Sequence, residues 1–170
     1  RLWEEIRKEI IINPGENYRI QERIRSLNEL GFSVGAIEMS EIDSGSQVIL
    51  RPTVTDRTFH RDQLLSLTGL DTEEMQARKM VNEILELQAT LSHRGNRNIP
   101  LNVTAYNWLN ETYLPTVDLL RGLVNPIMNE VELYCEVLEN KWYLSELAHH
   151  DVGHEYAAID YVRRFSSSAS

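Results

Sequence analysis

The sequence predicts an α+β fold that is predominantly helical, with about six helices and one antiparallel β-hairpin inserted after the second helix. Apolar residues recur at helical spacing along most of the chain. Between roughly residues 36 and 54 this spacing gives way to alternating apolar and polar residues around the turn-forming segment 43–46. A length of 170 residues suits one domain. We place it at 1–165, followed by a Ser-rich tail, 166–170, that we expect to be disordered.

The N-terminal part is expected to hold two helices and then the hairpin. Apolar residues near helical spacing predict a first helix over 1–12. Asn13 and Glu16 stand at capping-box positions for a second helix, which ends at Gly31 in a left-handed stop. Pro52 cannot donate a hydrogen bond to a neighbouring strand, so the second strand should lie at an edge or end there.

Two helices are expected after the hairpin. The first closes at Gly69, where glycine favours the left-handed conformation that ends helices. Asp71 and Glu74 then form a second capping-box pattern. It opens a long helix with one broad apolar side, which should end within the polar segment 93–98.

The C-terminal third is also expected to be helical. Pro115 does not fit inside a helix, so 101–125 should hold two short pieces. A last long helix is expected near 129–149, with a final amphipathic stretch after it. The apolar faces of all these helices should form the core, drawing on Ile20, Ile24, Leu27, Met80, Ile84, Leu87, Val137, Leu138 and Leu144.

Composition disfavours several classes of function. The chain has 17 basic and 26 acidic residues, whereas nucleic acids are bound mainly by Lys and Arg. No apolar run approaches the roughly 20 residues of a membrane-spanning helix. The single cysteine, Cys135, cannot form an internal disulfide and favours a reducing compartment. It lies among apolar residues of a helix, a setting typical of an inert thiol.

One tripeptide resembles a catalytic motif. His60, Arg61 and Asp62 match the start of a kinase catalytic loop, but Leu67 stands where that loop needs a metal-binding Asn. A glycine-rich loop and a partner lysine are also missing before it. We interpret the match as coincidental and assign no catalytic and no cofactor-binding residue.

A histidine cluster, 149–155, follows the last long helix. Two imidazoles four residues apart on one helix can share a zinc ion, which makes His150 and His154 weak metal candidates. Gly153 should interrupt the helix between them, and a third ligand is not evident. The alternative is a solvated helix end, at which histidines complement the helix dipole.

The predicted helix near 129–149 has two contrasting faces. Four glutamates and a tyrosine lie on one side, forming an acidic stripe that must face water or a basic partner: Glu132, Glu136, Glu139, Tyr143 and Glu146. Lys141 falls within the opposite, apolar face. It either extends its ammonium to solvent or forms a buried ion pair that locks the last helix in place, with Asp151 or Asp160 as the partner.

Three stretches resemble a known bacterial family: 22–32, 51–84 with the sequence HRDQLLSLTGLDTEEMQARKMVNEI, and 133–162 with EVLENKWYLSELAHHDVG. They resemble an uncharacterised, mainly actinobacterial domain found C-terminal to a domain similar to lipopolysaccharide kinases of the protein-kinase-like superfamily. Where that pattern usually has an arginine before the Trp-Tyr pair, this chain has Lys141. The resemblance implies a cytoplasmic protein with a kinase-like part before Arg1, and it supplies no catalytic residues.

Two classes of function follow from the sequence. The first is a non-catalytic regulatory or assembly domain that docks on its kinase-like neighbour or on another protein, without cofactor, nucleic acid or membrane span. The alternative is a small-molecule or metal-dependent hydrolytic domain that uses the cluster 149–155. Any kinase activity would belong to the part before Arg1.

Overall fold

A computed structural model of the chain describes residues 10–12, 22–27, 33–42, 45–53, 57–127 and 129–166, and it describes side chains in 22–27, 57–127 and 129–165. Most of the predicted first helix and the tail after Ser166 lie outside the described residues.

The fold class predicted from the sequence, a helical α+β domain with one inserted hairpin, is wrong for the residues whose side chains the structure describes. Among the residues whose side chains the structure describes, 81% are helical and none lies in a strand. Six α-helices account for this part of the chain, together with residues 22–27, which are also helical. Among the residues whose side chains are described, the core is therefore a helical assembly.

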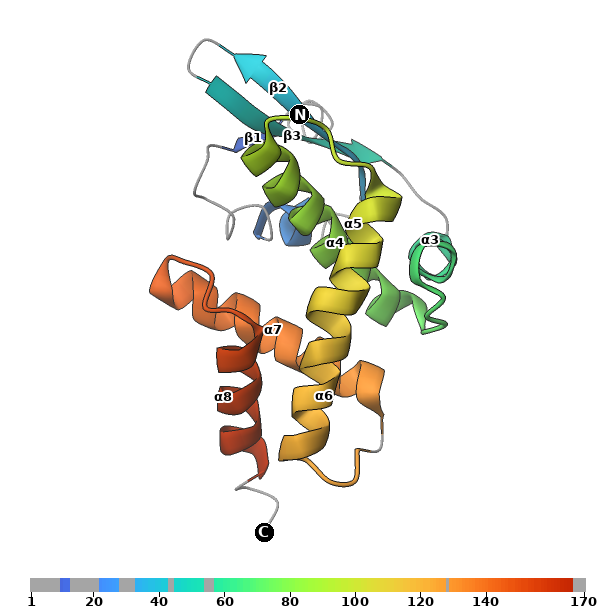
Figure 1. Ribbon diagram of the computed structural model, residues 1–170, viewed down its shortest axis with the longest axis vertical. Coiled ribbons are helices and arrows are strands. Elements are labelled where there is room, and N and C mark those ends of the chain that lie inside the picture. Colours follow the sequence, from blue (N-terminus) through green and yellow to red (C-terminus); the bar gives the residue numbers. More distant parts are fainter. Residues whose placement is uncertain are drawn as a thin grey trace.

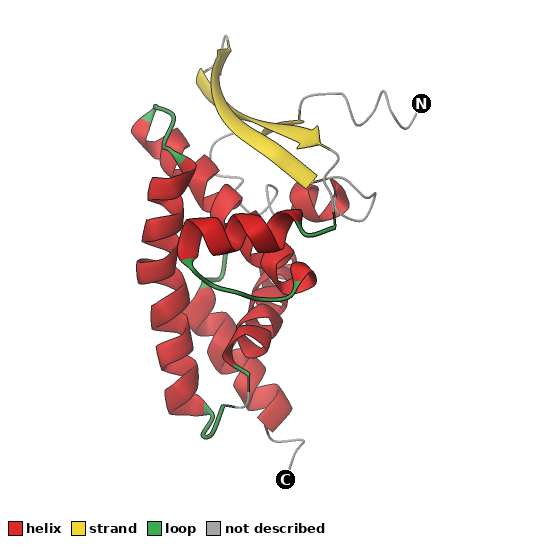
Figure 2. Cartoon of the chain, turned by 90° about the vertical axis from the view of Figure 1, so that its right-hand side faces the viewer, coloured by secondary structure: helices red, strands yellow, loops and turns green. Residues whose placement is uncertain are grey.

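Three strands precede the six α-helices along the backbone: β1 (Ile10–Ile12), β2 (Ser33–Ile42) and β3 (Gly45–Thr53). They form an antiparallel sheet of order β1-β3-β2, which lies at one end of the molecule beside α4 (Figures 1 and 2). The sequence predicts a helix over 1–12, and at residues 10–12 this prediction is wrong. Three consecutive β-branched isoleucines favour a strand when a neighbouring strand is available for pairing. They pair with β3, Ile11 opposite Ile49, so β3 is a central strand and Pro52 lies near its end.

Helices α3 (Phe59–Thr68) and α4 (Glu74–Gly95) follow the sheet. Gly69 ends α3 in the left-handed conformation, with a φ of 79°, and its N–H donates to the carbonyl of Leu65 at 2.9 Å. The capping residues of α4 lie two positions later than predicted, because the side chain of Gln76 accepts from the N–H of Glu73 at 3.4 Å. Asp71 instead binds Arg61, at 3.1 Å.

A nearly continuous helical rod crosses the molecule beside α4 (Figure 1). It consists of α5 (Leu101–Trp108), the π-helical turn η1 (Leu109–Tyr113) and α6 (Leu114–Leu123). The two short pieces predicted for 101–125 are present as α5 and α6, but the π-helical turn joins them, so Pro115 does not interrupt the rod. A proline lacks the N–H of the regular helical ladder. The wider π turn directly before α6 places Pro115 in the first turn of that helix, where no such donor is needed.

Helices α7 (Glu130–Ala148) and α8 (His154–Ser166) complete the fold. The side chain of Asn129 caps α7 by accepting from the N–H of Glu132 at 3.0 Å. One apolar cluster joins the helical residues 22–27 to α3, α4, α5, η1, α6 and α7, and a second joins α6, α7 and α8. Helices α6 and α7 belong to both clusters and connect the two parts of the core.

The predicted core residues fall mostly inside these clusters. Six of them are buried: Ile24, Leu27, Met80, Ile84, Val137 and Leu138. Leu87 and Leu144 are only half-buried, and Ile20 lies outside the described residues. None of the helices that the structure describes combines the length and apolarity that a membrane span requires.

Truncation of the two central side chains should destabilise the fold. Ile84 and Leu138 are both 0% exposed, so Ile84→Ala and Leu138→Ala should each lower the free energy of unfolding by about 2 to 5 kcal/mol. Urea denaturation followed by circular dichroism would measure this. Val103→Ala, at a position that is 46% exposed, is the control and should change stability by less than about 0.5 kcal/mol. Equal losses in all three variants would contradict these assignments.

Candidate functional site

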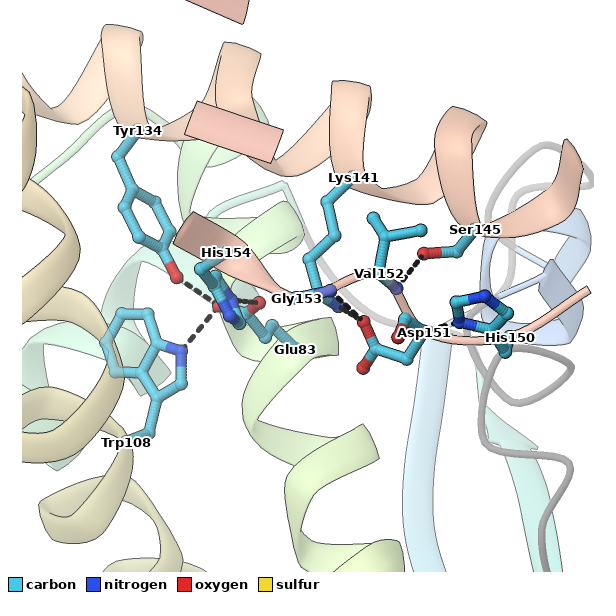
Figure 3. A network of polar contacts seen from close by, with 10 residues as sticks. All are labelled: Glu83, Trp108, Tyr134, Lys141, Ser145, His150, Asp151, Val152, Gly153 and His154. Atoms are coloured by element: carbon cyan, nitrogen blue, oxygen red, sulfur yellow. Dashed lines mark hydrogen bonds and ion pairs between the residues drawn. The ribbon is translucent and has the colours of Figure 1, made fainter. Parts of the chain in front are cut away.

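Glu83 lies on the inner face of α4 and brings an ionisable group into the core. Glu83 is 3% exposed. The indole N–H of Trp108 donates to Oε1 at 2.6 Å, and the hydroxyl of Tyr134 donates to the same oxygen. The ring nitrogen Nε2 of His154 lies 2.6 Å from the other oxygen, Oε2. Figure 3 shows these groups, which come from α5, α7 and α8, converging on one carboxylate.

Aromatic rings surround this carboxylate. The rings of Trp108 and Tyr134 meet edge to face with centroids 6.1 Å apart, and Tyr113 packs against Tyr134 at 4.8 Å. The imidazole of His154 stacks on Tyr134 at 6.4 Å. Edge-to-face and offset pairs are favourable arrangements for aromatic rings. The network therefore has an apolar outer layer, and each donor is held in position by ring packing as well as by its hydrogen bond.

The surroundings of Glu83 keep its carboxylate ionised. Burial raises the pKa of the group, but His154, Lys141 and Tyr134 together outweigh burial and lower the pKa from 4.5 to about 2. Burial and the adjacent Glu83 charge raise the pKa of Tyr134 well above its ordinary value. The tyrosine thus stays protonated as a donor and the glutamate stays charged as an acceptor.

Lys141 continues the network along α7 toward the start of α8. It is 1% exposed, and its Nζ lies 3.2 Å from Oδ1 of Asp151. Burial lowers the pKa of the ammonium, yet the negative charges of Glu86, Glu83 and Asp151 raise it above its usual value. The structure thus brings Lys141 to Asp151, but the carboxylates of α4 act on it as well.

Asp160, the other proposed partner of Lys141, has different contacts. Its Oδ2 accepts a hydrogen bond from the amide of Asn140 at 2.9 Å and lies 2.9 Å from the guanidinium of Arg164. Asn140 also donates to the carbonyl of Ala157, at 3.0 Å. These bonds join α7 to α8 through the residue next to Lys141. Asp160 thus holds α8 itself, whereas Asp151 holds the connection that precedes α8.

Four members of the network were not predicted: Glu83, Glu86, Trp108 and Tyr134. Glu83 carried a usable signal, because at 100° per residue it borders the side of α4 that presents Met80 and Leu87, whereas Glu86 lies on the other side of the helix. A carboxylate on an otherwise apolar helix face must be paired or extend to solvent. No comparable signal marked Trp108 or Tyr134, since an aromatic residue on an apolar face is usually a core residue.

The connection 149–153 is fixed by the same network. The N–H of Gly153 donates to Oδ1 of Asp151 at 2.9 Å, and the N–H of Val152 donates to the hydroxyl of Ser145 at 3.2 Å. His149 and Gly153 both have positive φ, 58° and 85°, so the chain reverses direction sharply between the helices. Lys141 lies over the middle of this turn (Figure 3).

An apolar groove opens beside this turn. We call it the α7–α8 groove; its cavity volume is about 470 Å³, and its lining residues are Leu144, Leu147, Ala148, His150, Val152 and Tyr156. Leu147 is 63% exposed and Tyr156 is 60% exposed. The groove thus has one wall from the end of α7, one from the start of α8, and a floor that includes the fixed turn.

The two candidate metal ligands do not share a site. His154 points toward Glu83 in the core, whereas Nδ1 of His150 lies 3.2 Å from the backbone carbonyl of Asp151 and its ring lines the groove. Figure 3 shows them on opposite sides of the pair formed by Lys141 and Asp151. Among the described residues, no group of three or more His, Cys, Asp or Glu side chains could hold a metal ion.

Three glutamates of the acidic stripe are engaged within the chain. Glu136 accepts from the hydroxyl of Tyr161, Glu139 pairs with Lys79, and Glu146 lies 3.0 Å from the guanidinium of Arg25. In contrast, Glu132 and Tyr143 are exposed, the latter at 55%. Tyr143 stands one helical turn before Leu147, so it extends the apolar wall of the groove along α7.

The kinase-like tripeptide has a structural role. Nδ1 of His60 lies 2.6 Å from Oε2 of Glu74, and the backbone N–H of Arg61 donates to Oε1 of the same residue at 2.9 Å. Arg61 also pairs with Asp71, at 3.1 Å. These contacts hold the first turn of α3 against the start of α4.

Cys135 is buried, and burial raises the pKa of its thiol to about 12.

Comparison with protein families gives one match, to a domain of unknown function (DUF4032), over residues 1–165. The chain belongs to the DUF4032 family. No curated protein and no solved structure matched it. The roles of the network and the groove therefore follow only from the geometry of this DUF4032 domain itself.

Three buried groups of this DUF4032 domain, Glu83, Tyr134 and Cys135, are poorly suited to proton transfer. A general base works best with a pKa near the working pH, whereas that of Glu83 is about 2. Tyr134 and Cys135 have raised pKa values and remain protonated at neutral pH. Such a network holds helices in place and keeps its charges fixed.

Replacement of Glu83 should remove an acid-sensitive part of the stability. The pKa of Glu83 is lower in the folded state, about 2, than its ordinary 4.5. Its stabilising contribution is therefore complete above pH 4.5 and is lost as the pH falls toward 2, on the order of 3 kcal/mol. Glu83→Gln should be less stable at pH 7 and lose less stability over this range, as measured by urea titrations. The control, Glu132→Gln at an exposed position, should keep the wild-type pH dependence; an unchanged profile in Glu83→Gln would contradict the assignment.

Replacing Lys141 and replacing Asp151 should lower the stability of the fold by different amounts. Lys141→Met leaves Glu83 and Glu86 buried without their shared cation, so it should destabilise by about 3 to 5 kcal/mol. Asp151→Asn should cost only about 1 kcal/mol, because the side chain of Asp151 is 40% exposed and an amide can still accept from Gly153. Thermal and urea unfolding of both variants would test this order. A larger loss of stability in Asp151→Asn than in Lys141→Met would show that Asp151, and not Glu83 or Glu86, is the main partner of Lys141.

Proposed function

We propose that this DUF4032 domain is a non-catalytic interaction and assembly domain that docks on another protein through the α7–α8 groove. The observation that carries the proposal is the combination of a closed interior network with an open apolar surface next to it. The network fixes the turn between α7 and α8, and that turn forms part of the groove. Buried polar groups placed in this way support a binding surface on rigid elements.

The surface itself has the character of an interaction site. Tyr143, Leu147 and Tyr156 are 55%, 63% and 60% exposed and lie along the end of α7 and the start of α8. Contiguous exposed apolar residues beside a groove commonly mark binding sites on soluble proteins. Aromatic side chains are also enriched among the residues that dominate binding energy at protein interfaces.

The chemistry of the interior supports a role without catalysis. His154 is held between Glu83 and the ring of Tyr134, so in this proposal it positions α8 and does not bind a metal. His150 contributes to the groove lining. The proposal therefore uses the cluster 149–155 as a structural turn rather than as a hydrolytic centre.

We further propose a bacterial cytoplasmic setting beside a kinase-like domain. Support comes from the resemblance of 22–32, 51–84 and 133–162 to the actinobacterial pattern. The single cysteine, Cys135, which is buried as a thiol, suits a reducing compartment. In such a protein the groove would dock the kinase-like part or a partner of it.

Partner capture should depend on the groove. Tagged chain would be used to capture proteins from the native host, with Leu147→Asp and Tyr156→Ala as groove variants and Tyr106→Ala as the matched control. Tyr106 is 68% exposed but lies on α5, away from the groove. Both groove variants should reduce recovery of specific partners by at least about tenfold, the loss expected for a central contact. The control should not.

Circular dichroism would establish that each variant folds. Full recovery of all partners by the folded groove variants would show that docking, if it occurs, uses another surface.

A further inference from the structure

We propose that the α7–α8 groove binds a basic amphipathic helix of a partner protein. This inference rests on the proposed function and specifies its partner. It is derived from the lining of the groove, the direction of its apolar wall, the charge of its surroundings and the rigidity of the turn that forms its floor.

The lining favours a helix over a small molecule. Five of the six lining residues are apolar or aromatic, and the sixth is His150. A small-molecule site usually combines an apolar cavity with several converging polar groups that orient the ligand. An apolar groove without such groups suits the nonpolar face of an amphipathic helix, which enters through side chains spaced by three or four residues.

The apolar wall also extends beyond the groove. Tyr143 precedes Leu147 by one helical turn and is similarly exposed, so the two form a ridge along α7. Tyr156 stands across from them at the start of α8. A helix lying along α7 could contact all three residues.

The charge of this end of the molecule selects a basic partner. Between residues 142 and 162 the sequence has no Lys or Arg and four acidic residues. Glu146, Asp151 and Asp160 already pair with Arg25, Lys141 and Arg164, so Glu155 is the acid that a partner would meet. Glu155 is exposed directly beside Tyr156. The last turn of α7 contains no basic residue, so the partial negative charge of that helix end adds to the acidic surroundings. Cations flanking the apolar face of a partner helix would be attracted here.

The same charges disfavour a second copy of this chain as the occupant. Two copies meeting groove to groove would bring Glu155 of each into the same acidic surroundings, and like charges across an interface are repulsive.

The turn that forms the floor of the groove is already fixed before a partner binds. Val152 and Gly153 are hydrogen-bonded to Ser145 and Asp151, so little ordering entropy is lost when a partner binds.

Designed peptides would test the inference on the chain itself. The probe is a fluorescent peptide of about 16 residues, roughly four helical turns, with Leu at i, i+3, i+4 and i+7 and Lys at the flanking positions. The matched peptide keeps every Leu and replaces each Lys with Glu. Fluorescence anisotropy should show binding of the basic peptide at least about tenfold tighter than that of the acidic one, with the difference shrinking as salt is added.

Variants would locate the binding. Leu147→Asp and Tyr156→Ala should each weaken binding of the basic peptide by about tenfold or more, the range of central interface contacts. Glu155→Lys should weaken it and reduce its salt dependence, while Tyr106→Ala on α5 should have no effect. Equal affinity for both peptides, or binding that the groove variants leave unchanged, would overturn the inference.

The outcome can be separated from that of the proposed function. Self-association that Leu147→Asp abolishes would identify a second copy as the occupant and overturn the basic helix. Partner capture that still depends on Leu147 and Tyr156, without preference for the basic peptide, would overturn the partner chemistry alone. Capture that is independent of both residues would overturn the docking function as well.

Discussion

The buried carboxylate of Glu83 is the constraint on which the arrangement of the C-terminal helices depends. A charge removed from water is costly unless hydrogen bonds and opposite charges surround it. Here Trp108 brings α5, Tyr134 brings α7 and His154 brings α8 to one group on α4. A shift of any of these helices would leave an ionised oxygen without its donor. The carboxylate therefore permits essentially one relative placement of four helices.

This constraint explains why a charged network is kept where apolar residues could pack. Buried ion pairs often contribute little net stability compared with an apolar replacement, and their better-supported role is to specify one arrangement among several. Helix α8 illustrates the need for such a device. Its buried apolar contribution is small, Ala157 and Ala158 being its only buried apolar residues among those described, and two methyl groups do not define a unique orientation. His154 with Glu83, Asp151 with Lys141, and Asp160 with Asn140 supply that orientation.

Local sequence signals predicted the positions of the helices better than they predicted how the helices pack. Gly69 marks a helix end through a conformation that depends on a few neighbouring residues, and it acts as that signal indicates. Residues 10–12 form a strand because β3 lies beside them, a fact that no local window contains. Pro115 follows the rule for proline, but the π turn that accommodates it depends on the whole rod. For the site, the burial of Lys141 was foreseeable from its helix face. The role of Glu83 was not, because its donors come from residues 25 to 71 positions away.

The distribution of basic residues connects the interior to the surface. With 17 basic residues against 26 acidic, many cations are already engaged in pairs within the fold. Arg25, Lys79 and Lys141 each pair with an acid that lies on α7 or directly after it. These pairs join α7 to its neighbours and use the nearby positive charge inside the molecule. At the start of α8, Glu155 remains exposed beside the apolar groove. In the proposed docking, this glutamate is the acid that a basic partner helix would meet.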